Sequence, residues 1–122
     1  MKVTTEKNEQ VANMIFANIY PLYLQRIEKN GRTKEELNKV IEWFTSYNKK
    51  DLQTLINEKV TFRTFFEKAT IQPNAYLIKG VVCGYRIEEI ENEFEVYKQC
   101  RRLEKLIDEL AKGRKIEKIL RK

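Results

Sequence analysis

The segment from Gly31 to Tyr47 constrains the fold more than any other part of the chain. Thr33 is followed three residues later by Glu36, which is the pattern of a capping box at the start of a helix. After the cap, apolar residues recur at the spacing of one helix face, at Leu37, Val40, Ile41 and Phe44. We therefore predict a helix here, and the segment contains no pattern that indicates chemistry.

The same periodicity continues through much of the chain. It predicts short helices after Asn48 and after Thr61, and a long helix over 91–112 that ends at Gly113. With only four Gly and two Pro, the composition also favours helix. We expect an all-α fold, a single compact domain of five or six helices with the long C-terminal helix as its spine.

The length of 122 residues is that of one domain, which we assign to 1–122. Residues 1–10 are polar, and we expect them to be disordered. Pro21 lies within a helical pattern that begins at Val11, where it either kinks one long helix or starts a second. At the other end, 114–122 is expected to form a basic terminal turn.

The segment 75–87 fits two structures. Its apolar residues suit a helix capped by Asn74, whereas Gly80, Gly84 and the pair Val81-Val82 are poor helix formers and suit a strand. We favour the helix, because a single strand would have no partner elsewhere in the chain. The spacing of Gly80 and Gly84 is interpreted as close packing of two helices in the core.

The net charge of +6 is concentrated at the C-terminal end of the chain. From Lys98 to Lys122 there are ten basic residues and four acids, so this segment carries the whole excess. Such a segment either complements helix dipoles and pairs with nearby acids, or binds nucleic acid or another polyanion. Upstream, Glu88, Glu91 and Glu95 would share one helical face, which we interpret as solvated rather than as a cation site.

The chain has no histidine, which removes the commonest general base and metal ligand. Its two cysteines, Cys83 and Cys100, form neither a zinc motif nor a disulfide framework. The glycines form no phosphate-binding loop. We expect no catalytic residues, no cofactor and no metal. An enzyme would have to use carboxylates and arginines, and this is the weakest of the functions considered below.

Aromatic residues are dense between Trp43 and Phe66. Core packing is the default interpretation, but their number leaves room for a partly exposed aromatic patch that would bind a partner. Trp43, Tyr47 and Arg86 are the residues that we select for such a binding site. The partners would be a second copy of the chain or another protein, with nucleic acid as the alternative.

No apolar run is long enough to span a bilayer, and the N-terminus lacks the apolar stretch of a signal peptide. We therefore expect no membrane association. With two unpaired cysteines, we expect a cytoplasmic protein with reduced thiols.

Several segments together resemble a known family. They are Tyr20 to Tyr23, Gly31 to Glu36, Trp43 to Tyr47, Leu77 to Gly84, Arg86 to Glu91, Leu106 to Gly113 and Glu117 to Lys122. On these residues the chain resembles an uncharacterised prokaryotic family, domain of unknown function 2200. Phe44 and Ser46 stand where the family pattern Trp-Leu-Thr-Gly-Tyr has Leu and Gly. The resemblance implies a relative but no activity.

Three hypotheses follow for the function. The first is a non-catalytic interaction module that uses an aromatic face or the long amphipathic helix. The second is a polyanion or nucleic-acid binder that uses Lys98 to Lys122, and the third is the small-ligand binder or enzyme.

Overall fold

The computed structural model describes residues 2–121. Its α-helices and two-stranded sheet are joined by short 3-10 turns. In chain order the elements are α1 (Thr5–Ala12), α2 (Phe16–Glu28), α3 (Lys34–Thr45), α4 (Lys49–Asn57), α5 (Phe62–Glu67), η1 (Pro73–Leu77), β1 (Val81–Val82), β2 (Tyr85–Arg86), η2 (Ile87–Glu89), η3 (Asn92–Phe94), α6 (Glu95–Ala111) and α7 (Ile116–Ile119).

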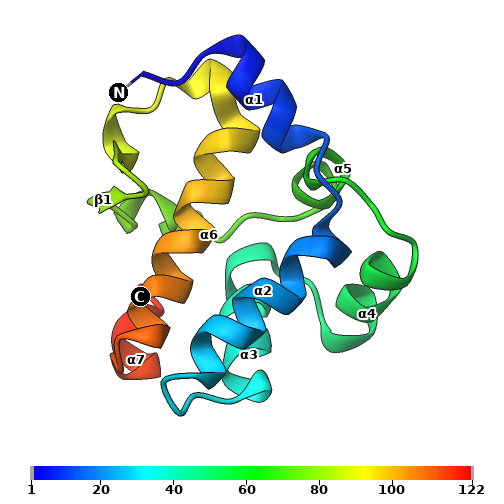
Figure 1. Ribbon diagram of the computed structural model, residues 1–122, viewed down its shortest axis with the longest axis vertical. Coiled ribbons are helices and arrows are strands. Elements are labelled where there is room, and N and C mark those ends of the chain that lie inside the picture. Colours follow the sequence, from blue (N-terminus) through cyan, green and yellow to red (C-terminus); the bar gives the residue numbers. More distant parts are fainter. Residues whose placement is uncertain (1, 122) are drawn as a thin grey trace.

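Helix α6 is the spine of the molecule (Figure 1). It contacts α1, α2, α3, α5, α7 and the hairpin, so nearly every other element packs on it. Its inward face is fully buried at Leu103, Leu106, Ile107 and Leu110. The prediction of a helical domain with a long C-terminal helix is confirmed, although α6 begins at Glu95, after the 3-10 turn η3, rather than at Glu91.

The predicted caps form. Thr33 and Glu36 make the reciprocal bonds of a capping box at the start of α3, and Asn48 and Asp51 do the same at α4. The side chain of Thr61 accepts a hydrogen bond from the N–H of Thr64 at the start of α5. Local side-chain bonds of this kind depend on sequence spacing alone, which is why they are predictable.

The N-terminal half differs from the prediction in two ways. The expected disorder of residues 1–10 is not what the structure shows over Thr5–Ala12, which forms α1. Asn8 on this helix is buried, and its amide oxygen accepts a hydrogen bond from the N–H of Tyr97 in the first turn of α6. Phe94, at the cap position of α6, makes no side-chain cap bond among residues 2–121. Asn8 therefore caps α6 in its place, and this hydrogen bond also holds α1 against α6.

The break between α1 and α2 falls before Phe16, not at Pro21, which lies inside α2. It is caused by a pairing with the segment before α5. The N–H of Phe16 donates to the carbonyl of Val60, and the N–H of Phe62 donates to that of Met14. These bonds take the backbone out of the helical ladder, and sequence periodicity does not reveal them.

Residues 81–86 form a β-hairpin, which corrects the prediction of a helix. Val81 pairs with Arg86, and Val82 with Tyr85, in an antiparallel register. The connecting Cys83 and Gly84 both have positive φ, 51° and 81°, as a two-residue type I′ turn requires. The argument that a strand would lack a partner was wrong, because the segment turns back and pairs with itself.

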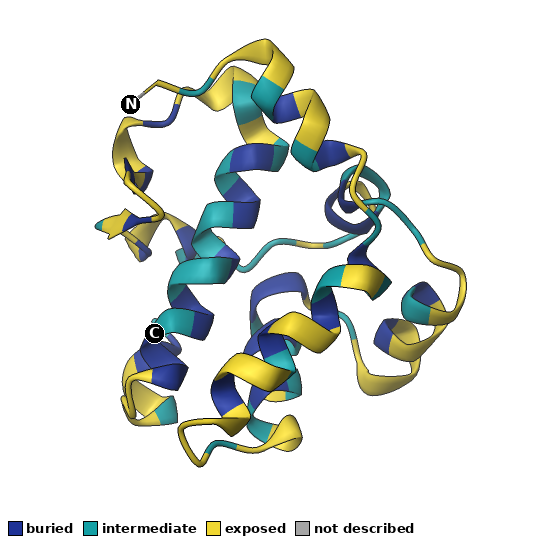
Figure 2. Ribbon diagram, in the orientation of Figure 1, coloured by how far each residue is buried: buried dark blue, intermediate teal, exposed yellow. Residues whose placement is uncertain are grey.

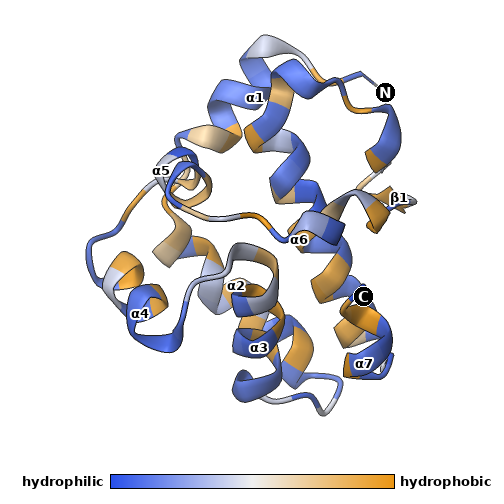
Figure 3. Cartoon of the chain, turned by 180° about the vertical axis from the view of Figure 1, so that it is seen from behind, coloured by the Kyte–Doolittle hydropathy of each residue, from blue (hydrophilic) through white to orange (hydrophobic). Residues whose placement is uncertain are grey.

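Most of the buried residues, which are dark blue on the ribbon of Figure 2, belong to one core between α6 and the helices around it. A second, small cluster of Tyr85, Ile90 and Tyr97 lies between the hairpin and the N-terminal end of α6. Seen from behind, apolar β1 projects from the outside of the molecule (Figure 3). No helix among residues 2–121 is long and apolar enough to cross a membrane.

Candidate functional site

The three residues selected from the sequence lie in different surroundings. Trp43 and Tyr47 are half-buried and pack against the main core. The ring of Tyr47 lies 5.3 Å from that of Phe65, and its hydroxyl donates to the Phe65 carbonyl. Burial raises the pKa of Tyr47 to about 12. Arg86 is exposed on the hairpin and pairs with Glu89 at 3.9 Å.

These positions do not describe an open aromatic patch. Phe44, Phe62, Phe65 and Phe66 are all buried. The hydroxyl of Tyr47 is already bonded within the chain. The four phenylalanines in this part of the sequence therefore form core packing, and the choice of Trp43, Tyr47 and Arg86 as binding residues stays a prediction.

The three glutamates that the sequence places on one helical face do not share one. Glu88 lies in η2, Glu91 precedes η3, and Glu95 begins α6, so they belong to different elements. Glu88 accepts a hydrogen bond from the N–H of Gly80, and backbone hydrogen bonds lower the pKa of its carboxyl group. Among residues 2–121, no group of three or more acids and cysteines is arranged to hold a metal ion.

Much of the basic charge near the C-terminus is used inside the protein. Arg121 binds the carboxylate of Glu109 through two nitrogens, at 2.6 and 2.8 Å, and Arg114 approaches the same carboxylate at 3.2 Å. Lys112 pairs with Asp108 at 3.0 Å. The pairs of Arg121 and Arg114 fasten the chain after α6 onto that helix. The pair of Lys112 and Asp108 lies at the last turn of α6 itself.

Lys98 and Arg102 are different. They lie one turn apart on α6, both are partly buried, and within the described chain neither has a carboxylate within 4 Å. Lys98 donates to the amide oxygen of Asn92 at 3.1 Å, and Arg102 donates to that of Gln99 at 3.2 Å. The Arg102 Nε is buried without a hydrogen-bond partner.

Burial lowers the pKa of both side chains. For Lys98 the neighbouring positive charge of Arg102 lowers it further, whereas for Arg102 the carboxylate of Glu95 opposes the effect of burial. The two cations border a cavity of about 220 Å³ that Asn92, Glu95 and Gln99 also line. This is a donor-rich pocket beside the N-terminal turns of α6.

An apolar pocket of about 180 Å³ lies where α1, α2, α5 and α6 meet. Tyr23 and Cys100 form part of its wall, and Met14 and Ile19 stand at its side. Burial raises the pKa of Cys100 to about 12 and that of Tyr23 well above its ordinary value. The hydroxyl of Tyr23 is buried and has no hydrogen-bond partner in the described part of the chain.

The rim of the apolar pocket is polar on one side. Arg101 and Glu104 form an ion pair there, and Arg101 also lies over the ring of Tyr97, 4.7 Å from its centroid. The thiol of Cys83, at the tip of the hairpin, donates to Glu104 at 3.3 Å. Because burial raises the pKa of the Cys83 thiol, and Glu104 adds to this effect, the group is a poor nucleophile near neutral pH.

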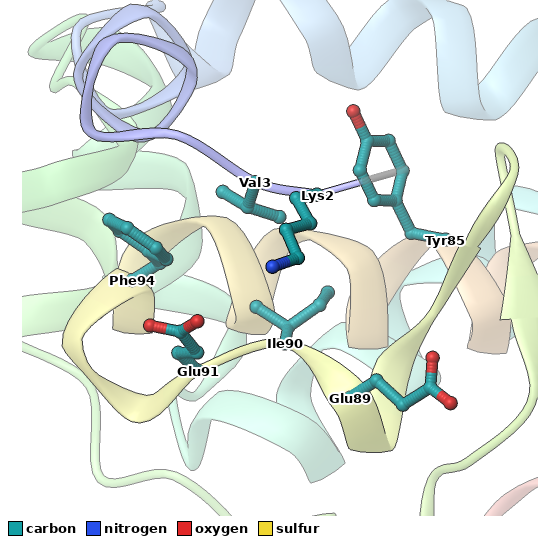
Figure 4. A pocket seen from close by; sticks show the side chains of 7 residues that line it. All are labelled: Lys2, Val3, Tyr85, Glu89, Ile90, Glu91 and Phe94. Carbon is teal, nitrogen blue, oxygen red and sulfur yellow. The ribbon is translucent and has the colours of Figure 1, made fainter.

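A third cavity, of about 160 Å³, lies between the N-terminal segment and the turn before α6 (Figure 4). Lys2 and Val3 lie over Ile90, with Phe94 and Glu91 at one side and Tyr85 at the other. The hydroxyl of Tyr85 accepts a hydrogen bond from Lys7 at 2.8 Å. The residues around this cavity join the N-terminal segment to the small cluster of Tyr85, Ile90 and Tyr97. We therefore interpret the cavity as part of the packing between these segments and not as a binding site.

The sequence analysis included Lys98 and Arg102 only as part of the basic segment Lys98 to Lys122, and it singled out neither the other residues of that pocket nor the apolar pocket. One signal was present for Arg102, since no acid lies three or four residues from it on the helix. No signal was present for the apolar pocket, because Tyr23 and Cys100 belong to elements that meet only in the folded protein.

Comparisons with known proteins agree with this fold. A family model described as an uncharacterized protein conserved in bacteria, DUF2200, matches residues 10–121. The chain is also similar to the crystal structure of the uncharacterized protein SP1917, with 34% identity and a TM-score of 0.84 over 92% of this chain and 91% of that chain. No curated protein matches. Because the family model spans nearly the whole chain, this protein is a member of the DUF2200 family.

Proposed function

We propose that this protein is a non-catalytic interaction module whose face around α2 and the apolar pocket binds a second copy of the chain. The observation that carries this proposal is the presence of a projection and a recess on the same face. Leu22 is 57% exposed on α2, between Ile19 and Tyr23, which both line the pocket. Met14, at the pocket's side, is 43% exposed.

A two-fold interface needs a surface that is complementary to itself, because each copy presents the same patch to the other. Leu22 of one copy can fill the pocket of the other, and the symmetry repeats the contact. The pocket suits an aliphatic side chain, since its walls are mostly apolar. The ion pair of Arg101 and Glu104 would stand at the rim of the contact, where polar residues are typical.

Binding of a polyanion by the whole segment from Lys98 to Lys122 is a weaker hypothesis. Arg114, Arg121 and Lys112 already pair with acids of α6, so they offer little uncompensated charge. Removing the segment after Gly113 would not test it cleanly, because Ile119 and Leu120 are buried in the core.

Sedimentation equilibrium across a concentration series tests the dimer. We expect the molar mass to rise with concentration in the native protein and to stay monomeric in Leu22→Glu. Val81→Glu is the matched control, because Val81 is 51% exposed, lies on the hairpin and does not line the pocket. Each copy carries a net charge of +6, so added salt should strengthen the association by screening the repulsion.

A mass that stays monomeric at every concentration and salt level would overturn the proposal. So would a dimer that Leu22→Glu and Val81→Glu weaken to the same extent, since the α2 face would then have no special part in it.

A further inference from the structure

We propose that the pocket formed by Asn92, Lys98, Gln99 and Arg102 binds an oxyanion, of the phosphate class, carried by a small molecule. This inference is independent of the dimer, because the pocket lies at the N-terminal turns of α6 and shares no residue with the apolar pocket. It starts from two cations that the fold keeps together, neither of which forms an ion pair with a carboxylate among residues 2–121.

Two like charges one helical turn apart repel each other, and partial burial increases that cost. Elsewhere in this protein such guanidinium groups pair with carboxylates, as Arg121 does with Glu109 and Arg101 with Glu104. Arg102 has no such partner within the described chain. Its Nε is buried without a hydrogen bond among residues 2–121, as is that of Arg101, so the missing carboxylate is what distinguishes Arg102. A bound anion would supply the missing negative charge.

The two amides of the pocket are arranged as donors. The oxygen of Asn92 accepts from Lys98, and the oxygen of Gln99 accepts from Arg102. Their NH₂ groups have no hydrogen-bond partner among residues 2–121 and remain available. The pocket therefore combines an ammonium, a guanidinium and two amide donors, which together match the acceptor oxygens of a phosphate group.

Glu95 is the one carboxylate that lines this cavity. It attracts Arg102 and repels an incoming anion, so it competes with the ligand for the same cation. This gives the proposal an unusual test, because removal of a charge from the pocket should improve binding rather than harm it.

The experiment is a titration of the ¹⁵N-labelled protein with inorganic phosphate at low ionic strength, followed by NMR. We expect saturable shifts confined to the first turns of α6 and to the Nε–H of Arg102. Arg102→Gln and Lys98→Gln should each weaken binding about tenfold or more, since hydrogen bonds between charged groups are the strong ones. Glu95→Gln should tighten binding about threefold, because one repulsive charge is removed.

Arg86→Gln is the matched control, because Arg86 is exposed, lies on the hairpin and should not affect the titration. Unsaturable shifts spread over many lysines would overturn the proposal and indicate an adventitious ion only. So would equal effects of Arg102→Gln and Arg86→Gln. If Arg102→Gln does not fold, the phosphate titration of Lys98→Gln tests the proposal instead, provided that the spectrum of this variant is that of a folded protein.

A single-stranded oligonucleotide in a parallel titration separates the two sources of phosphate. If the small-molecule assignment holds, the shifts caused by the oligonucleotide remain within the pocket. The double variant Lys115→Gln/Lys118→Gln then binds the oligonucleotide with unchanged affinity. If those substitutions weaken oligonucleotide binding as much as Arg102→Gln does, the assignment is wrong and the ligand is a nucleic-acid backbone.

Discussion

The two ends of α6 treat positive charge in opposite ways. At the C-terminal end, Glu109 holds Arg121 and Arg114, and the three groups fasten α7 to the spine. At the N-terminal end, Lys98 and Arg102 face a cavity, and Glu95, the one carboxylate among residues 2–121 that lines it, forms an ion pair with neither. The cations at the C-terminal end form ion pairs, and those at the N-terminal end bond only to neutral amides within residues 2–121. The difference shows that the total charge of a segment does not indicate which of its cations form ion pairs.

The largest effect is expected at the paired end. Glu109→Gln leaves two guanidinium groups without their carboxylate, and loss of one member of a largely buried ion pair should cost about 3 kcal/mol of unfolding free energy. For a domain of this size, that lowers the melting temperature by roughly 10 °C. Thermal unfolding followed by circular dichroism measures the change.

Glu117→Gln is the control for this prediction, because Glu117 is exposed on α7 and should change the stability by less than about 0.5 kcal/mol. Equal losses for Glu109→Gln and Glu117→Gln would show that the paired end does not stabilise the fold, and the contrast between the two ends would disappear.

Alkaline pH should lower the stability of the fold through Cys100, which lies in the N-terminal half of α6. Burial raises the pKa of Cys100 to about 12 from an ordinary 9.0, so between these values the folded state holds a proton that the unfolded state releases. Stability is therefore complete below pH 9 and falls as pH rises toward 12. At pH 10.5 the loss from this thiol alone is about 2 kcal/mol. Urea unfolding at pH 8 and pH 10.5 measures it.

Cys100→Ala removes the thiol and should lose clearly less stability between those two pH values than the native protein does. Tyr97, with its pKa raised to about 12 mainly by burial, keeps part of the slope in the variant. Parallel pH profiles for the two proteins would contradict the assignment.

Replacing an arginine by methionine should change the stability of the fold in opposite directions at the two ends of α6. Arg102→Met keeps the apolar stem and removes a half-buried charge without a carboxylate partner, so we expect it to be neutral or to stabilise the fold by up to about 1 kcal/mol. Arg121→Met should destabilise it, since it strips Glu109 of its bidentate partner. Denaturant midpoints of the two variants decide the matter, and destabilisation by both would remove the contrast.

The smallest effect concerns a site away from both ends. Ser46 ends α3 in the left-handed conformation, with φ of 63°, at a position that Gly commonly takes in helices. Its hydroxyl donates to the carbonyl of Thr70 at 2.6 Å, which offsets the strain. Ser46→Gly should remain within about 0.5 kcal/mol of the native protein, and Ser46→Ala should be about 1 kcal/mol less stable. Equal stability of the two variants would show that the backbone is not strained.

Local signals predicted most of the helices but little of the candidate site. The caps at Thr33, Asn48 and Thr61 and the stripe on α6 involve residues close in the chain, so spacing was enough to find them. The hairpin was missed because its turn uses Cys83-Gly84 rather than the common Asn-Gly or Asp-Gly pairs. Two of the three residues selected for binding, Trp43 and Tyr47, are aromatic and pack against the core, whereas Arg86 is exposed on the hairpin.

By itself, the sequence determined the helical class, the long spine and the excess of positive charge near the C-terminus. These depend on periodicity and composition, which need no contact between distant residues. Only the tertiary structure decided which cations are neutralised, because Glu109 meets Arg121 through the return of the chain after Gly113. It also decided where α1 ends and what lines the apolar pocket, since both depend on side chains and backbone groups that packing brings together from separate elements.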